Sequence, residues 1–116
     1  NLDMNDLNEI YDDVRNAAYE IIERKKATYY GIGLSLNKLI NSIFNDTNKI
    51  LCVSAYLDHE YKHKDIYIGV PCVINREGIK EVIQLPLNGV DQGKFDDSYE
   101  ILRKLKVEVK KDLGLS

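Results

Sequence analysis

The first pattern in the sequence is one face of an amphipathic helix. Between Asp6 and Arg24, apolar residues recur at the i, i+3, i+4 and i+7 positions that share one side of a helix. These residues are Leu7, Ile10, Tyr11, Val14, Ala17, Ala18, Ile21 and Ile22. Asp3 or Asn5 can cap the start, and the basic residues at the end suit the helix dipole. We therefore predict a long helix that buries this face.

A second helical pattern follows a break. The break is segment 27–33, Ala-Thr-Tyr-Tyr-Gly-Ile-Gly, whose glycines permit close approach of the backbone to a neighbour. The apolar positions of the second pattern are Ile32, Leu36, Leu39, Ile40, Ile43 and Phe44. Spacing alone favours a kink whose tyrosines belong to the core. The alternative is functional, with the Thr28 hydroxyl directed into a cavity.

Two small residues interrupt the predicted buried face of the first helix. Ala17 and Ala18 stand where larger aliphatic side chains are expected. Either another helix crosses closely at this point, or the small side chains leave room for a ligand. From spacing alone we favour the helix crossing.

The second half of the chain alternates between strand and turn patterns. β-branched and aromatic residues bounded by turn residues predict three antiparallel strands. The predicted strands are 50–57, 66–74 and 79–87. Gly78 suits a hairpin turn between the last two strands, whereas Gly69 and Pro71 imply a bulge or an edge position for the middle strand.

The end of the chain is predicted to be helical. Residues 88–93 have the composition of a loop, and apolar positions from Phe95 to Val109 then mark a helix with acidic residues early and basic residues late. The order is therefore helix, broken helix, three antiparallel strands and helix. This order predicts the α+β class.

Composition adds limits to this prediction. A chain of 116 residues with 44% hydrophobic content suits one domain, residues 1–116, with one core. The 16 basic and 19 acidic residues give a net charge of −3, which does not favour a nucleic-acid or anionic-membrane partner. No apolar run approaches the roughly 20 residues of a membrane span. Helical periodicity is already running by Leu7 and the chain starts at Asn1 without Met, so we expect a piece of a longer polypeptide.

Candidate chemistry is sparse. His59, Glu60 and His63 could be drawn as a metal site, but we favour a solvated hairpin loop because no further motif with metal-ligand spacing accompanies them. Cys52 and Cys72 are predicted to be two buried free thiols, with a disulfide between neighbouring strands as the alternative. No phosphate-binding glycine motif follows a strand, and no nucleophile motif is present. We therefore predict neither a catalytic residue nor a metal ligand in this chain.

Several separated blocks of the sequence resemble the C-terminal, substrate-side domain of bacterial L-lactate dehydrogenases. The blocks are 16–22, 27–32, 53–57, 65–71 and 73–79, in the same order. The resemblance covers roughly residues 14–105. It implies a fold in which a long helix and a broken helix pack on a twisted antiparallel sheet, with a C-terminal helix.

The resemblance also implies a function for the complete protein. The family interconverts pyruvate and L-lactate with NADH and NAD in the cytoplasm, in glycolysis and fermentation, and usually forms a homotetramer. Its Gly-rich cofactor fold, catalytic His-Asp pair, carboxylate-binding Arg and effector-binding positions lie upstream of this chain. The expected partners are therefore pyruvate or L-lactate, an N-terminal NAD-binding domain of the same protein and further subunits. The isolated chain is expected to be inactive and to self-associate through exposed apolar surface.

The resemblance gives roles to four residues. It implies that Thr28 lies against the substrate, that Ala17 and Ala18 lie near its methyl end, and that Ile32 packs on the nicotinamide ring of NAD. These roles reverse the preference for a simple packing kink. The alternatives are a malate dehydrogenase of the same superfamily and a stand-alone, non-catalytic interaction module.

Overall fold

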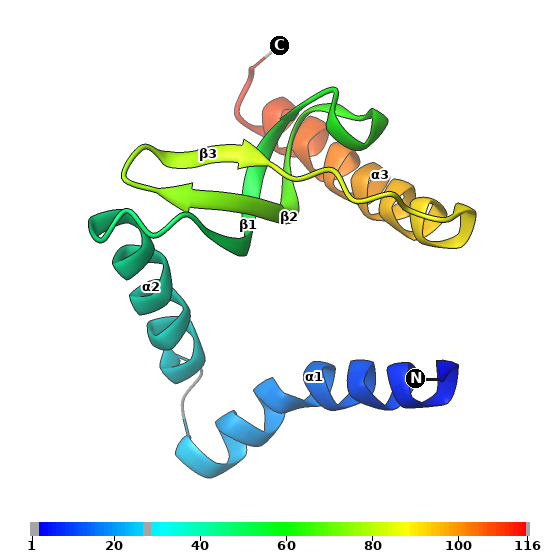
Figure 1. Ribbon diagram of the computed structural model, residues 1–116. Helices are drawn as coiled ribbons and strands as arrows, with labels where there is room; N and C mark the ends of the chain where they lie inside the picture. Colours follow the sequence, from blue (N-terminus) through cyan, green and yellow to red (C-terminus); the bar gives the residue numbers. More distant parts are fainter. Residues whose placement is uncertain (1–2, 27–28, 116) are drawn as a thin grey trace. The chain divides into compact units, whose positions relative to one another are not determined.

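The structure of the protein is a computed structural model that describes residues 3–26 and 29–115, apart from the side chain of Ala18 (Figure 1). The chain forms two compact units, Asn1–Asn41 and Ser42–Ser116. The first contains a helix and most of a second helix. The second contains the end of that helix, a three-stranded sheet and a long C-terminal helix.

Helix α1 spans Met4–Lys25 and begins where its capping residue predicts. Asp3 Oδ1 accepts hydrogen bonds from the backbone N–H groups of Asn5 at 2.7 Å and Asp6 at 2.9 Å. Asp6 in turn accepts one from the backbone of Asp3 at 3.0 Å, which completes a capping box. The helix ends at Lys26, whose φ of 57° is left-handed. The predicted helix and its Asp3 cap are therefore confirmed. Of the predicted break, segment 27–33, residues 27–28 lie outside the described residues, and residues 29–33 are already helical, so the second helix begins earlier than predicted.

Helix α2 spans Tyr29–Phe44 and is tied to the sheet by its last turn. The hydroxyl of Ser42, which is only 1% exposed, donates to the carbonyl of Ile74 at 3.0 Å. Its oxygen also lies 2.7 Å from the Thr47 hydroxyl. Because a buried hydroxyl is costly unless it is bonded, this contact fixes the end of α2 against β2.

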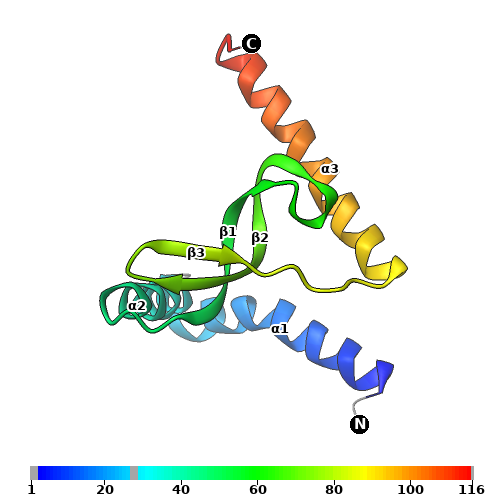
Figure 2. The same ribbon diagram turned by 45° about the horizontal axis from the view of Figure 1, so that its top comes forward.

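The sheet contains three antiparallel strands, as predicted, and their order is β1-β2-β3. The strands are β1 (Lys49–Asp58), β2 (Lys64–Asn75) and β3 (Gly78–Val82), and Figure 2 shows the two hairpins that join them. Gly78 has a φ of 87°, so the β2–β3 turn uses the freedom of glycine as expected. Alternate residues on one face form most of the core. The buried aliphatic residues are Ala55, Leu57, Ile66, Ile68, Val70 and Ile74.

Of the two positions expected for the middle strand, a bulge or an edge, the edge is wrong, because β2 is the central strand. Pro71 is tolerated there because of the register. Its carbonyl accepts from the backbone of Ile83 at 2.8 Å, so its nitrogen also faces the β3 side, just beyond the last paired residue, Val82. A register shift does occur in β2, but between Val73 and Ile74 and not at Pro71.

The third strand is shorter than the predicted 79–87, because it ends at Val82. Beyond Val82, hydrogen bonds to the side chain of Tyr61 hold the backbone in place of hydrogen bonds between strands. The Tyr61 hydroxyl donates to the carbonyl of Ile83 at 2.6 Å and accepts from the N–H of Leu85 at 3.0 Å. One buried side chain therefore replaces two backbone partners.

Helix α3 spans Gly89–Asp112 and begins earlier than predicted. Segment 88–93 is not a loop, because Asn88 is the N-cap and accepts from the N–H of Asp91 at 2.8 Å. Figures 1 and 2 both show α3 running beside the β1–β2 hairpin. The Tyr99 hydroxyl bonds to the carbonyl of Lys64 at 3.4 Å, and Lys106 pairs with Asp65 at 2.8 Å. These contacts join α3 to the start of β2.

The two cysteines are free, but they differ in environment. Cys72 is buried, as predicted, whereas Cys52 is exposed. Cys72 pairs with Leu51 across the strands, so Cys52, the next residue along, projects from the opposite face of the sheet. The prediction of two buried thiols is therefore wrong for Cys52, and the register separates the two sulfur atoms.

Candidate functional site

The four residues implied by the resemblance lie in or near the first two helices. Ala17 is exposed on α1, and Ile32 is 59% exposed in the first turn of α2. Thr28 and the side chain of Ala18 lie outside the described residues. The structure therefore gives Ala17 and Ile32 open surfaces, and the roles of all four residues stay predictions.

The glycines beside Ile32 do not make the close approach that the sequence suggested. A β-carbon placed on Gly31 would lie 3.9 Å from Cδ1 of Ile21, which is ordinary contact, and one placed on Gly33 would meet nothing within 4 Å. Neither glycine has a positive φ. Within the described part of the chain, no neighbouring atom lies close enough to Gly31 or Gly33 to require a glycine there.

A second cluster joins the β1–β2 loop to α3 and was missed from the sequence. The side chain of His63 is 16% exposed, and its Nε2 lies 2.6 Å from Oδ1 of Asp96. Its ring stacks on Tyr99, with centroids 3.9 Å apart and planes at 18°. Hydrogen bonds from Gln92 and then from His63 hold the pKa of the Asp96 carboxyl below its usual range. The solvated-loop prediction is therefore wrong for His63, although His59 is exposed.

The same loop has an unusual backbone. It contains a short 3₁₀ helix, Glu60–Lys62, and positive φ occurs at three of its residues and at Asp65 near the start of β2, none of them glycine. They are His59 at 80°, Tyr61 at 53°, Lys62 at 66° and Asp65 at 60°. Each such residue is strained, so the contacts of Tyr61 and His63 hold a loop that would otherwise relax.

The His63–Asp96 pair is best explained as a structural contact that joins the β1–β2 loop to α3. In the described residues, no group of three or more His, Cys, Asp or Glu side chains is arranged to hold a metal ion. The sequence contains one pattern that could have indicated this contact between His63 and α3. Gln92, Asp96 and Tyr99 recur with helical spacing on one side of α3, which is the side that meets His63.

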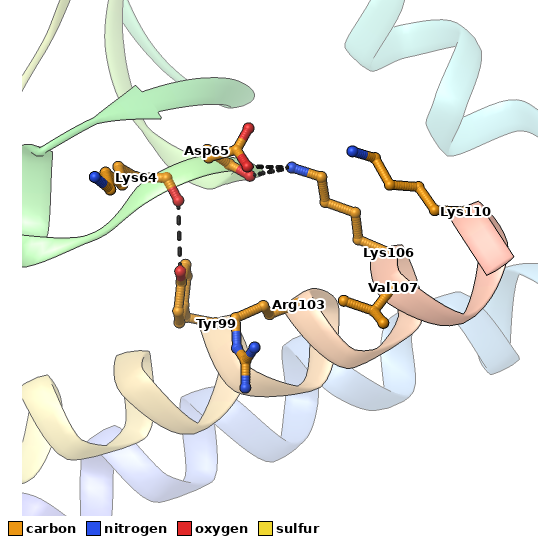
Figure 3. Close-up of a pocket in the computed structure, with 7 residues that line it drawn as sticks. All are labelled: Lys64, Asp65, Tyr99, Arg103, Lys106, Val107 and Lys110. Carbon is orange, nitrogen blue, oxygen red and sulfur yellow. Dashed lines mark hydrogen bonds and ion pairs between the residues drawn. The ribbon is translucent and has the colours of Figure 1, made fainter. Parts of the chain in front are cut away.

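Two neighbouring hollows lie between α3 and the β1–β2 hairpin. One is a cavity of about 290 Å³, shown in Figure 3, which is lined mainly by charged residues of α3 and the start of β2. The other is an apolar groove of about 590 Å³ lined by residues of α3, β1 and β2 and by the end of the chain. In the cavity, a hydrogen bond from Lys106 holds the pKa of Asp65 below its usual range.

Large apolar side chains are exposed on both α1 and α2. They include Val14 at 70%, Leu34 at 68% and Phe44 at 82%. Helices that pack against a partner present such residues on the face that the partner covers. None of the helices in the described part of the chain combines the length and apolar character needed to cross a membrane.

Comparison with known proteins identifies the fold. The sequence profile of the lactate/malate dehydrogenase α/β C-terminal domain matches residues 1–113. L-lactate dehydrogenase 2 of a Bacillus cereus strain is 51% identical over 104 residues, which are 90% of this chain and 33% of that protein. The chain thus spans about a third of the length of the curated relatives it matches.

Solved structures agree with this result. The ligand-bound minor L-lactate dehydrogenase of Enterococcus mundtii has a TM-score of 0.80 and 45% identity, covering 89% of this chain and 33% of its own. Malate dehydrogenase of Salinibacter ruber has a TM-score of 0.84 but 27% identity, covering 97% and 38%. The predicted α+β class, with its antiparallel sheet and its C-terminal helix, is confirmed. The chain belongs to the lactate/malate dehydrogenase family, as its α/β C-terminal domain.

Proposed function

We propose that this chain is the C-terminal domain of an L-lactate dehydrogenase, which interconverts pyruvate and L-lactate with NADH and NAD. The observation that carries the proposal is sequence identity. Identity is 51% to an L-lactate dehydrogenase of Bacillus cereus but 27% to a malate dehydrogenase of Salinibacter ruber. The TM-scores of the two enzyme types are similar, so the backbone alone does not separate them.

The proposed contribution of this chain is one wall of the substrate and nicotinamide pocket. The Thr28 hydroxyl would orient the polar substrate, and the small side chains of Ala17 and Ala18 would leave room for its methyl end. Ile32 would present an aliphatic surface to the nicotinamide ring. An exposed aliphatic side chain in the first turn of α2 fits this role, because an apolar surface excludes water from a reacting ring.

When bound, NAD supplies the hydride acceptor or donor of the reaction. The groups that move the proton and hold the carboxylate are proposed to lie in the part of the enzyme that precedes this domain. His63 does not replace them, because its Nε2 is engaged by Asp96 and its ring is covered by Tyr99. The residues of this domain therefore bind, orient and exclude water.

The partners follow from the exposed surfaces of α1 and α2. Large apolar side chains such as Tyr19, 71% exposed, and Leu34, 68% exposed, are unfavourable in water. We propose that this surface meets the enzyme's own NAD-binding domain and other subunits of a homo-oligomer. The complete enzyme would act in the cytoplasm, in glycolysis and fermentation.

A chimera tests the proposal. Residues 1–116 would be joined to the N-terminal two thirds of the Bacillus cereus enzyme, in place of that enzyme's matching C-terminal part. We expect pyruvate-dependent oxidation of NADH by the chimera, faster than oxidation with oxaloacetate, and no oxidation by residues 1–116 alone. The unmodified Bacillus cereus enzyme is the matched control. A folded chimera without activity, or turnover by the isolated chain, would contradict the proposal.

A further inference from the structure

The peptide bond between Asn88 and Gly89 can take part in a reaction that needs no partner molecule except water. The side-chain amide of an asparagine can be attacked by the backbone nitrogen of the next residue. Glycine hinders this attack least, because it has no β-carbon and its backbone rotates freely. Asn88 is the one asparagine in the sequence that a glycine follows.

The backbone nitrogen of Gly89 is available for this attack. Gly89 is the first residue of α3, so its N–H group has no partner within the helix. Asn88 and Gly89 are both exposed, which gives water and hydroxide access to them. A β-carbon placed on Gly89 would meet nothing within 4 Å, and its φ is not positive. Alanine therefore fits at position 89, which provides a clean test variant.

The structure holds the side chain of Asn88 away from the Gly89 nitrogen. Oδ1 of Asn88 accepts from the N–H of Asp91 at 2.8 Å, and its Nδ2 donates to Oδ2 of Asp91, also at 2.8 Å. The Asn88 carbonyl accepts from the N–H of Gln92 at 2.9 Å. At its ψ of 171°, the Gly89 nitrogen does not eclipse the β-carbon of Asn88, as closure of a five-membered ring requires. The ring can therefore close only when the first turn of α3 opens.

We propose that Asn88 is a site of spontaneous deamidation, and that its two hydrogen bonds with Asp91 slow this reaction in the folded chain. The Gly89 nitrogen loses its proton to hydroxide and forms a bond to Cγ of Asn88. The bond between Cγ and Nδ2 breaks, and ammonia leaves with a proton from water. Water then opens the succinimide ring. Opening at Cγ gives aspartate, and opening at the backbone carbonyl carbon gives isoaspartate.

The two products have different effects on α3. Aspartate is itself a good N-cap and can still accept from the N–H of Asp91. Isoaspartate leads the backbone through Cγ, which adds one methylene to the main chain and removes the side-chain cap. Its changed carbonyl position also disturbs Gln92, which donates to Asp96 at 2.8 Å and to the carbonyl of Tyr61 at 3.4 Å. Isoaspartate at position 88 should therefore loosen the start of α3 from the β1–β2 loop.

This inference is independent of the proposed enzyme activity, because none of its residues belongs to the proposed pocket wall. Incubation of the 116-residue chain at mildly alkaline pH tests it, since base removes the proton from the attacking nitrogen. Peptide mass spectrometry should locate the exchange of an amide nitrogen for oxygen at residue 88. A methyltransferase specific for isoaspartate should label the same peptide. The folded chain should convert at least about fivefold more slowly than the urea-unfolded chain, because two hydrogen bonds must break first.

The nucleophile is tested in the unfolded chain, where differences in helix stability have no effect. Gly89→Ala should slow conversion of Asn88 about tenfold, because a β-carbon hinders the approach of the nitrogen. Gly93→Ala is the matched control. A β-carbon at position 93 also meets nothing within 4 Å, and this substitution should leave the rate unchanged.

The role of Asp91 is tested by the ratio of the folded to the unfolded rate. Asp91→Ala removes the acceptor for Nδ2 of Asn88 but keeps the backbone donor, so the ratio should rise about threefold. Asp97→Ala removes a carboxylate from the same helix that forms no hydrogen bond with Asn88, and it should leave the ratio unchanged.

Three results would overturn the proposal. The first is a folded chain in which another asparagine converts before Asn88, or in which Asn88 is unchanged long after the unfolded chain has converted. The second is an equal rate for Gly89→Ala and the unaltered sequence in the unfolded state. The third is an equal ratio of folded to unfolded rates for Asp91→Ala and the unaltered chain, which would remove the role of Asp91.

Discussion

The Nε2 atom of His63 lies 2.6 Å from Oδ1 of Asp96, so the β1–β2 loop is joined directly to the first half of α3. Asp96 also accepts a hydrogen bond from Nε2 of Gln92 at 2.8 Å. Both bonds favour the charged carboxylate, which places the pKa of Asp96 below its usual range. The position of α3 along the hairpin therefore depends in part on one charge.

This relationship predicts a pH-dependent effect of Asp96→Asn. A carboxyl whose pKa is lower in the folded state stabilises the fold above its unfolded pKa of about 3.9 and loses that contribution as pH falls through the folded value. Asp96→Asn should therefore be less stable than the unaltered chain at pH 7, and the difference should shrink below about pH 4. Urea unfolding at several pH values measures it. Asp97→Asn is the matched control, and a difference that stays constant with pH would contradict the prediction.

Tyr61→Phe should be destabilising although it removes a single oxygen. The hydroxyl satisfies the carbonyl of Ile83 and the N–H of Leu85, and Tyr61 is 7% exposed. Losing a buried hydrogen-bonding partner costs about 1–3 kcal/mol in the free energy of unfolding. Tyr67→Phe, at a position that is 65% exposed, should cost little. Equal effects of the two substitutions in urea unfolding would count against a special role of the Tyr61 hydroxyl.

Lys62→Gly should stabilise the chain. Lys62 has a φ of 66°, a conformation that costs a residue with a side chain about 1–2 kcal/mol and costs glycine little. Part of this gain is offset by the greater freedom of glycine in the unfolded chain, so we expect a net gain of up to about 1 kcal/mol. Thermal unfolding measures it. The control Lys80→Gly, in β3, should destabilise by about 0.5–1 kcal/mol, and a loss at both positions would refute the strain argument.

Thr28→Gly in the complete enzyme should change substrate preference. Removing the hydroxyl and methyl groups enlarges the proposed pocket, so the ratio of kcat/KM for a bulkier 2-oxo acid to that for pyruvate should rise about tenfold. Steady-state oxidation of NADH with the two substrates gives this ratio. Ser35→Gly, which removes a hydroxyl from α2, should leave it unchanged. An unchanged ratio for Thr28→Gly would remove Thr28 from the pocket.

Long periodic patterns made most of the fold predictable. The apolar repeat and Asp3 cap located α1, and Gly78 located the β2–β3 turn, because local chemistry decides both features. The start of α3 was missed because two glycines after Asn88 resemble a loop, whereas capping by Asn88 outweighs their low helix propensity. The early end of β3 depends on Tyr61, more than twenty residues away along the chain, and no local pattern reveals such a contact.

Less of the candidate site than of the fold could be predicted from the sequence. Thr28, Ala17, Ala18 and Ile32 were proposed from resemblance, and periodicity alone favoured packing roles for them. The helical spacing of Gln92, Asp96 and Tyr99 indicated one polar side of α3, but the sequence did not show that His63 meets it, because they become neighbours only when the hairpin packs beside that helix. The same is true of the two hollows that Lys106 and Lys110 line.

The β1–β2 register leaves this protein with one accessible cysteine thiol, that of Cys52. Cys52 projects into solvent from one face of the sheet, while the Cys72 thiol on the other face is buried, and burial raises its pKa. An accessible cysteine thiolate attacks the double bond of a maleimide reagent, so a dye or spin label should attach at one position per molecule without any engineered cysteine. Oxidation of the native chain should for the same reason cross-link two molecules through Cys52 and should not close a bridge within one.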